Sequence, residues 1–274
     1  MTVAGIGREE SQIKNRKSKI ENMIDGNDTT VDWQRHDGEV CILPVGAFEQ
    51  HSAHLPLDTD NIEADHFGRI LAEDLDATLL PTLRFATSLE HTGFRGTVTL
   101  RPETAMRVIR DIADEVERQN FTILIVVNSH GGNFFLKPVI RDINRVNRPL
   151  KVLEVYPWDF IDADLRAAAL AEHPGGEIHC TDEETSVMLV LAPDRVHMDR
   201  CRDRKPDTST KNVYPLEQSD LTTFGVRHFA PAGAVGYPSF ATAEKGRAIL
   251  EAIRRNMAPV VKDRIERLGK DRLY

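Results

Sequence analysis

The chain has 274 residues, which is the length of one large domain or two small ones. Its 35 Lys and Arg against 43 Asp and Glu give a formal charge of −8, and this acidic balance argues against a nucleic-acid partner, because phosphate binding needs a basic surface. No apolar run approaches the roughly 18 residues that cross a bilayer, so no membrane partner is expected. Cys41, Cys180 and Cys201 show no CxxC spacing, and with no secretory signal at the N-terminus we expect a reduced, cytoplasmic protein.

Apolar runs and stretches of helical periodicity alternate along the chain. Residues 1–38 are polar and are predicted as an N-terminal extension, with a surface helix over 9–23. Strands are predicted at 40–46, 78–83, 121–128 and 152–156. Helices are predicted at 60–75, from Pro102 onward, and at 135–146, 159–171, 183–191 and 242–268, with a polar loop over 201–232. This alternation predicts one domain over 39–274, a three-layer α/β/α sandwich with a mostly parallel central sheet.

Chemistry-bearing side chains follow two of the predicted strands, where sites form in open parallel sheets. The first strand runs into GAFEQHSAHLPLDTD, which holds Glu49, His51 and Asp60, and the central strand runs into NSHGGN, which holds His130. Glu49 and His51 are two residues apart, so on extended backbone their side chains face the same way. Carboxylate and imidazole suit Zn²⁺, Mn²⁺ or Fe²⁺, and a loop that folds back would let Asp60 bridge two such ions.

Each of these features also has a purely structural interpretation. Asp60 with Glu63 matches a capping box at the start of the next helix. The Gly131–Gly132 pair fits a plain strand-to-helix turn or a phosphate cradle at a helix N-terminus. His54 and Asp58 fit supporting or surface positions better than ligand positions, and Asn128 and Asn133 fit side-chain hydrogen bonds that hold the His130 turn.

A third polar segment, GGEIHCTDEETS at 175–186, precedes an apolar helix and contains His179 and Glu184. Thr181 and Glu184 match a second capping box, T-x-x-E. Cys180 beside His179 leaves open a thiol nucleophile, and an exposed acidic loop is the remaining interpretation.

Four further residues are candidates for contact with a substrate. Glu90 and His91 lie in a predicted loop that leads back toward the sheet, where a pair of surface residues is an equally good interpretation. Trp158 follows a strand end and could stack on a planar substrate or pack in the core. Tyr237 precedes the last helix and could contact substrate or a neighbouring subunit.

Five segments, LPVGAFEQHSAHLPLDTD, EHTGFRGTVTL, NSHGGN, EIHCTDEETSVML and GAVGYPSFATAEKG, together resemble the creatininase family of metal-dependent amidohydrolases, from about residue 40 to 252. The resemblance implies an α/β/α fold, a homo-oligomer (often a hexamer) and two divalent metal ions per subunit. It implies that Glu49, Asp60 and His130 hold one ion. It also implies that His51, a bridging Asp60 and Glu184 hold the other. His179 matches the acid/base histidine.

Two departures from the family pattern indicate a substrate other than creatinine. True creatininases carry an aromatic residue and a metal-binding Glu where this chain has Gly131 and Gly132, and the family usually reads Phe-Pro-Gly-Thr where Arg95 replaces the proline. If Arg95 faces the pocket, it indicates an anionic or strongly polar substrate. The wider family that the chain resembles includes a deformylase of opened purine rings, a peptidase that trims a cofactor precursor and a hydrolase of a keto-inositol.

The expected function is therefore hydrolysis of a cyclic amide or formamide in a small polar substrate, by water that two metal ions activate. Opening of a keto-sugar or keto-inositol ring is an alternative, since the same metal-bound nucleophile serves both reactions. An alternative from another class is a non-catalytic small-molecule-binding protein on the same fold.

Overall fold

The computed structural model describes residues 23–172, 178–204 and 223–270. Its centre is a four-stranded parallel sheet in the order β2-β1-β3-β4, with Val40 opposite Ile123 and Ile123 opposite Lys151. The strands are β1 (Val40–Val45), β2 (Thr78–Leu79), β3 (Ile123–Asn128) and β4 (Lys151–Val155). All six residues of β3 are buried, as expected for a central parallel strand with both faces covered.

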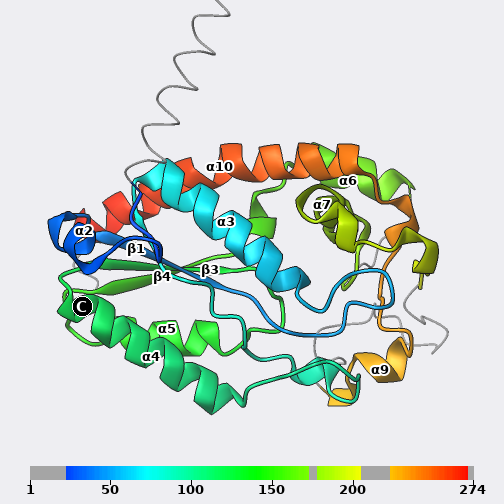
Figure 1. Cartoon of the computed structure of the whole chain (residues 1–274), viewed down its shortest axis with the longest axis horizontal. Coiled ribbons are helices and arrows are strands. Elements are labelled where there is room, and N and C mark those ends of the chain that lie inside the picture. The colour runs from blue at the N-terminus through cyan, green and yellow to red at the C-terminus, as the bar shows by residue number, and fades with distance from the viewer. Residues whose placement is uncertain (1–22, 173–177, 205–222, 271–274) are drawn as a thin grey trace, which may run out of the picture.

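Helices cover both faces of the sheet (Figure 1). One layer contains α3 (Thr59–Leu75), α7 (Asp182–Leu191) and α10 (Ala243–Lys270), and the other contains α4 (Pro102–Arg118) and α5 (Leu136–Asn144). Because successive strand side chains point to opposite faces, Ile42 packs with the α3 and α10 side chains while Cys41 and Leu43 pack with those of α4 and α5. The predicted three-layer α/β/α sandwich is confirmed.

Shorter elements complete the described part of the chain. They are α2 (Thr30–Arg35), η1 (Leu89–His91), η2 (Pro157–Phe160), α6 (Ala163–Glu172), η3 (Pro193–Arg195), η4 (Met198–Arg200), α9 (Val226–Phe229) and η5 (Pro238–Phe240). The helix predicted at 159–171 starts late, at Ala163, because Pro157 opens a separate 3₁₀ turn before it.

The strand predicted at 78–83 is shorter than expected. β2 ends at Leu79, although Leu80 and Leu83 still donate to the Ile42 and Pro44 carbonyls, both at 2.9 Å. Pro81 lies between them and has no N–H to donate, so the ladder is interrupted there.

Most of the predicted surface helix over 9–23 lies outside the described residues. Within the described part of residues 1–38, Met23 belongs to the core and the Ile24 carbonyl accepts from the Leu79 N–H at 2.9 Å. The domain boundary at residue 38 stays a prediction. Searching the described helices for a stretch long and apolar enough to cross a membrane finds none.

Candidate metal centre

The loop after β1 brings three of the predicted ligands together. The Glu49 N–H donates to the Leu57 carbonyl at 3.2 Å, so the chain folds back on itself and delivers Asp60 to the first turn of α3. There the Asp60 Oδ1 lies 3.5 Å from the His51 Nε2. Glu49, His51 and Asp60 are all buried. The fold-back that would bring Asp60 to this cluster is present.

His130 enters the same cluster from the end of β3. Its Nε2 lies 3.2 Å from the Glu49 Oε2, and its Nδ1 lies 3.5 Å from the Asp60 Oδ2. Asn128 accepts from the His130 backbone N–H at 3.1 Å and from the Asn133 amide at 3.0 Å, while Asn133 also donates to the Gly46 carbonyl after β1. The predicted role of the two asparagines in holding this turn is confirmed.

Glu184 reaches the cluster from the first turn of α7. Thr181 is the N-cap of α7 and accepts from the Glu184 backbone N–H at 3.0 Å, which leaves the Glu184 carboxylate free to lie 3.5 Å from the His51 Nε2. The predicted cap and the predicted ligand position therefore coexist, because one uses the backbone of Glu184 and the other its side chain.

The predicted capping role of Asp60 is wrong. α3 begins at Thr59 with Asp58 as its N-cap, so Asp60 lies inside the first turn with its side chain in the cluster. Asp58 instead accepts from the Asn61 amide at 2.7 Å and pairs with Arg84 at the surface. His54 is a supporting residue as expected, buried with its Nε2 3.1 Å from the Thr185 hydroxyl.

His179 is held by the backbone of the β1 loop. Its Nε2 lies 2.8 Å from the Gln50 carbonyl oxygen, which can only accept, so Nε2 carries the proton and Nδ1 presents a lone pair. That Nδ1 lies 3.7 Å from the Glu49 Oε1. Burial lowers the pKa of His179 to about 4, with His51 adding to the effect. The imidazole is therefore a neutral base that faces the cluster.

The carboxylates and imidazoles perturb one another strongly. Burial raises the pKa of Glu49 to about 8, against the opposing effect of His130. Burial opposes the charged form of His51, but the neighbouring Asp60 and Glu184 carboxylates outweigh it and raise the His51 pKa well above its usual value. Burial likewise opposes ionised Glu184, and His51 overcomes this and lowers the Glu184 pKa to about 2.

The cluster is short of positive partners. Within the described part of the chain, several buried atoms have no hydrogen-bond partner, namely both oxygens of Glu49 and of Glu63, Asp60 Oδ2, Glu184 Oε2, and the Nε2 atoms of His51 and His130. Five overlapping triads of these and adjoining side chains place their ligand atoms within 4.8 Å of one another. Buried carboxylate oxygens without hydrogen-bond donors are costly unless a cation compensates them, so this donor set fits divalent metal ions.

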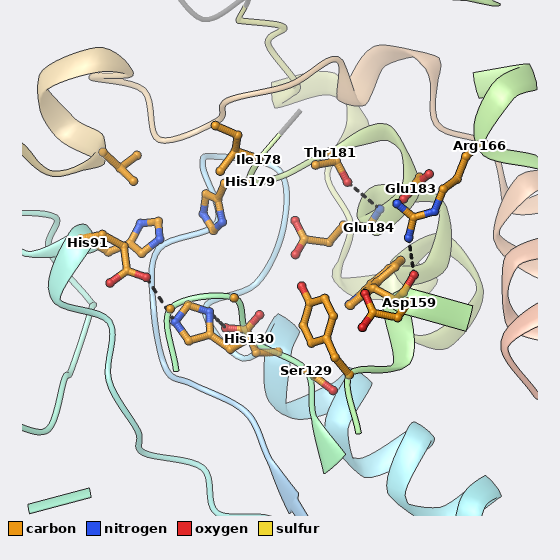
Figure 2. A pocket seen from close by; sticks show the side chains of 17 residues that line it. His91, Ser129, His130, Asp159, Arg166, Ile178, His179, Thr181, Glu183 and Glu184 are labelled. Carbon is orange, nitrogen blue, oxygen red and sulfur yellow. Dashed lines mark hydrogen bonds and ion pairs between the residues drawn. The ribbon is translucent and has the colours of Figure 1, made fainter. Parts of the chain in front are cut away.

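A pocket of about 360 Å³ opens onto the cluster (Figure 2). Figure 2 shows the His91, His130, His179 and Glu184 side chains pointing toward one central space. Among the predicted substrate contacts, Glu90, His91 and Trp158 line this pocket. Trp158 is 9% exposed and also packs edge-on against Phe67 at 6.0 Å, so both of its expected environments are present.

Two predicted substrate contacts are not among the described residues that line the pocket. Arg95 has an exposed side chain and lies in a turn between Gly93 and Gly96, both with positive φ. Tyr237 is buried beside Phe240, with ring centroids 6.5 Å apart. The hint of an anionic substrate from Arg95 therefore loses its basis.

The thiol nucleophile and the phosphate cradle are also wrong. Burial raises the pKa of the Cys180 thiol well above its usual value, so it supplies no thiolate nucleophile at neutral pH. A phosphate cradle at Gly131–Gly132 is excluded because the Glu90 carboxylate fills the space beside Gly132 and would repel an anion.

Two residues of the site were not assigned to the metal centre from the sequence. Glu63 is fully buried between Asp60 and Glu184, and its spacing of three residues after Asp60 could have placed it on the same helix face. The second residue is Gln50, whose amide donates to the His91 Nδ1 at 2.8 Å. No sequence pattern predicts this contact, because the two residues are 41 positions apart.

Comparison with known proteins gives consistent matches over most of the chain. Residues 28–261 match the family model for creatininase, described as creatinine amidohydrolase. The mycofactocin precursor peptide peptidase of Mycobacterium ulcerans is 32% identical over 84% of this chain and 84% of its own length. The creatinine amidohydrolase of Pseudomonas putida is 28% identical over 84% of this chain and 94% of its own length. A solved structure described as "Creatininase Mn" is 26% identical, with a TM-score of 0.73 over 88% of this chain and 98% of the other.

The fold, the donor set and these matches define a metal-dependent amidohydrolase. The chain belongs to the creatininase family. The family expectation from the five sequence segments is therefore confirmed.

Proposed function

We propose that this protein uses two divalent metal ions to hydrolyse an amide bond in a small polar substrate. The observation that carries the proposal is the set of buried carboxylate oxygens, without hydrogen-bond partners, that surround two imidazoles. Glu49, His130 and Asp60 would hold one ion, and His51, Glu184 and the same Asp60 would hold the other. The two oxygens of Asp60 face different histidines, so Asp60 lies between the two halves of the centre.

Carboxylate and imidazole ligands accept Zn²⁺, Mn²⁺ or Fe²⁺. When bound, such ions lower the pKa of a water molecule and polarise a substrate carbonyl. The chain's own residues supply the rest. The Gln50 carbonyl keeps the proton on the His179 Nε2, so Nδ1 can take a proton from the attacking water and pass it to the leaving nitrogen. A positioned acid–base group of this kind contributes about 10²–10⁴-fold to the rate.

The pocket sets the size and polarity of the substrate. Its volume of about 360 Å³ is at the lower end for small-molecule sites, which run from roughly 300 to 1,000 Å³. Tyr156, Trp158 and His91 are among the residues that line the pocket. The names of the two relatives give a precursor peptide and creatinine as their substrates. We propose that the reacting group in the substrate of this chain is likewise an amide.

The family expectation of a homo-oligomer, and the expectation of a cytoplasmic location, remain part of this proposal. Size-exclusion chromatography with light scattering would test the oligomer, with a monomer at micromolar concentration contradicting it.

Variants of three side chains separate metal binding from proton transfer. We expect Asp60→Ala and His130→Ala to lose bound metal and activity together, because they remove donors. We expect His179→Ala to keep its metal and lose about 10²–10⁴-fold in kcat. The two measurements are metal content, by plasma mass spectrometry, and turnover. The control is Asp65→Ala, which removes a half-exposed carboxylate from α3, the helix that contains Asp60.

Full metal content in Asp60→Ala, or near-parent turnover in His179→Ala, would show that these roles are assigned wrongly. A panel of cyclic amides, formamides, short peptides and keto-inositols identifies the reaction. Turnover of keto-inositols alone would favour ring opening. A metal-free protein that binds ligands from the panel without turnover would favour a non-catalytic binding protein.

A further inference from the structure

We propose that Glu90 is a ligand of the metal ion that Glu49 and His130 hold, and that Gly132 is required because the Glu90 carboxylate occupies the space of its missing side chain. This inference rests on the proposed function and adds a residue to one of its two ion sites. It goes beyond the expectation that Glu90 is a candidate for contact with the substrate.

Glu90 comes from η1, on a different segment from every other proposed ligand. Its side chain is only 9% exposed, and its Oε1 lies 3.5 Å from the His130 Nε2. The Glu49 Oε2 approaches that same nitrogen at 3.2 Å. Ligand atoms of Glu49, Glu90 and His130 all lie within 4.8 Å of one another, so one ion could contact all three.

The three carboxylates around His130 approach its ring from two sides. Asp60 faces the His130 Nδ1 at 3.5 Å, whereas Glu49 and Glu90 face Nε2. A histidine binds a given ion through one nitrogen, and its other N–H commonly donates to a carboxylate that orients the ring. Glu49 and Glu90 therefore flank the His130 nitrogen that would bind this ion, while Asp60 approaches the other nitrogen of the ring. The bridging role of Asp60 that the family resemblance implies stays a prediction.

Gly132 supplies an independent steric observation. A Cβ at this position would overlap the Glu90 Oε1, crowd the His130 Nε2 and lie 2.7 Å from the Glu90 Cδ. A residue with any side chain at 132 would displace both groups. At the neighbouring Gly131, by contrast, the nearest atom to a Cβ is the Tyr156 hydroxyl at 3.9 Å, which is ordinary contact. Of the two glycines, only Gly132 is therefore required by the geometry of the site.

The first experiment counts metal ions in isosteric variants. Parent, Glu90→Gln and the control Asp159→Asn are loaded with Mn²⁺, desalted and analysed by plasma mass spectrometry, with circular dichroism to confirm folding. Asp159 lines the same pocket but belongs to none of the donor triads found among the described residues. We expect two ions in the parent and in Asp159→Asn, and one ion in Glu90→Gln.

Electron paramagnetic resonance gives a second readout that does not depend on turnover. The signal of a coupled manganese pair in the parent should become that of an isolated ion in Glu90→Gln. Retention of two ions and of the coupled signal in Glu90→Gln would overturn the proposal. A parent that itself never binds two ions would instead contradict the proposed function.

The glycine pair provides the matched steric test. We expect Gly132→Ala to lose the same ion as Glu90→Gln, and the double variant to lose no more than either single one, because both changes act on one site. Gly131→Ala should keep both ions. Equal metal content in the two alanine variants would contradict the steric argument, even if the Glu90 variant behaved as expected.

Discussion

The imidazoles of His51, His91 and His179 are oriented by backbone carbonyls and by an amide side chain, none of which is a proposed metal ligand. The His51 Nδ1 donates to the Glu49 carbonyl at 3.2 Å, and the His179 Nε2 donates to the Gln50 carbonyl at 2.8 Å. The Gln50 amide donates to the His91 Nδ1, which leaves the His91 Nε2–H facing the Glu49 Oε1 at 3.2 Å. The backbone of one loop therefore selects the tautomers of His51 and His179, and it presents the His51 Nε2 and the His179 Nδ1 to the centre.

Glu63 provides a test, at the level of one residue, of the excess of buried carboxylates in the metal-free centre. Burial, with the Glu184 and Asp60 carboxylates beside it, holds the pKa of Glu63 well above its usual range. We expect Glu63→Gln to raise the melting temperature of the metal-free protein by about 2–8 °C. The reason is that it relieves an uncompensated buried acid worth roughly 1–2 kcal/mol, at about 2–4 °C per kcal/mol for a large domain.

Calorimetry of the chelated protein measures this shift. Glu251→Gln, an exposed position on α10, is the matched control and should not change the melting temperature. A Glu63→Gln variant that melts at or below the parent temperature would mean that Glu63 is already compensated in the metal-free protein.

At this scale the sequence could predict the residues that motif spacing brings together. Glu49, His51 and Asp60 lie in one loop, and His130 follows the adjacent strand, so strand-end logic is enough to find them. Glu63 and Glu90 could not be assigned in this way. The role of Glu63 depends on where α3 begins, and that of Glu90 depends on a space beside Gly132 that only the folded chain defines.

Among the elements, the start of α7 both caps the helix and positions a side chain of the metal centre. Its N-cap, Thr181, accepts from the backbone of Glu184, whose carboxylate faces His51, so helix start and site geometry are coupled. We expect Thr181→Ala to lower the free energy of unfolding by about 1 kcal/mol and Thr181→Ser to preserve it, as is typical for N-caps. Urea denaturation of the metal-free protein measures both.

Metal affinity provides a further check on the same pair of variants. If the cap positions Glu184, Thr181→Ala should also bind its metal more weakly than Thr181→Ser. Equal stability of the alanine and serine variants would show that this cap contributes nothing measurable.

Element prediction succeeded where the pattern was long and failed where local chemistry interrupted it. β1 and β3 match their apolar runs because both are buried strands of a parallel sheet. β2 ends at Leu79, two residues before Pro81, and α6 begins at Ala163, after the 3₁₀ turn that starts at Pro157. Pro81 divides the apolar run of the second strand, whereas Pro157 opens a 3₁₀ turn that takes up the first residues of the predicted helix.

For the whole molecule, the sandwich explains why residues so far apart in sequence meet. The carboxyl ends of β1, β3 and β4 share one edge of the sheet, and α3 and α7 begin at that edge (Figure 1). Asn133 ties the β1 and β3 ends together through the Gly46 carbonyl and Asn128. This general placement follows from parallel topology and could be predicted. Which nitrogen of His130 each carboxylate faces could not, since that depends on side-chain packing.

The most direct measurement is a crystal structure of the manganese-loaded protein with anomalous scattering recorded at the manganese edge. We predict two anomalous peaks per chain, one among Glu49, Glu90 and His130 and the other among His51, Asp60 and Glu184. A single peak, or a protein that crystallises from millimolar manganese with neither position occupied, would contradict a two-metal centre.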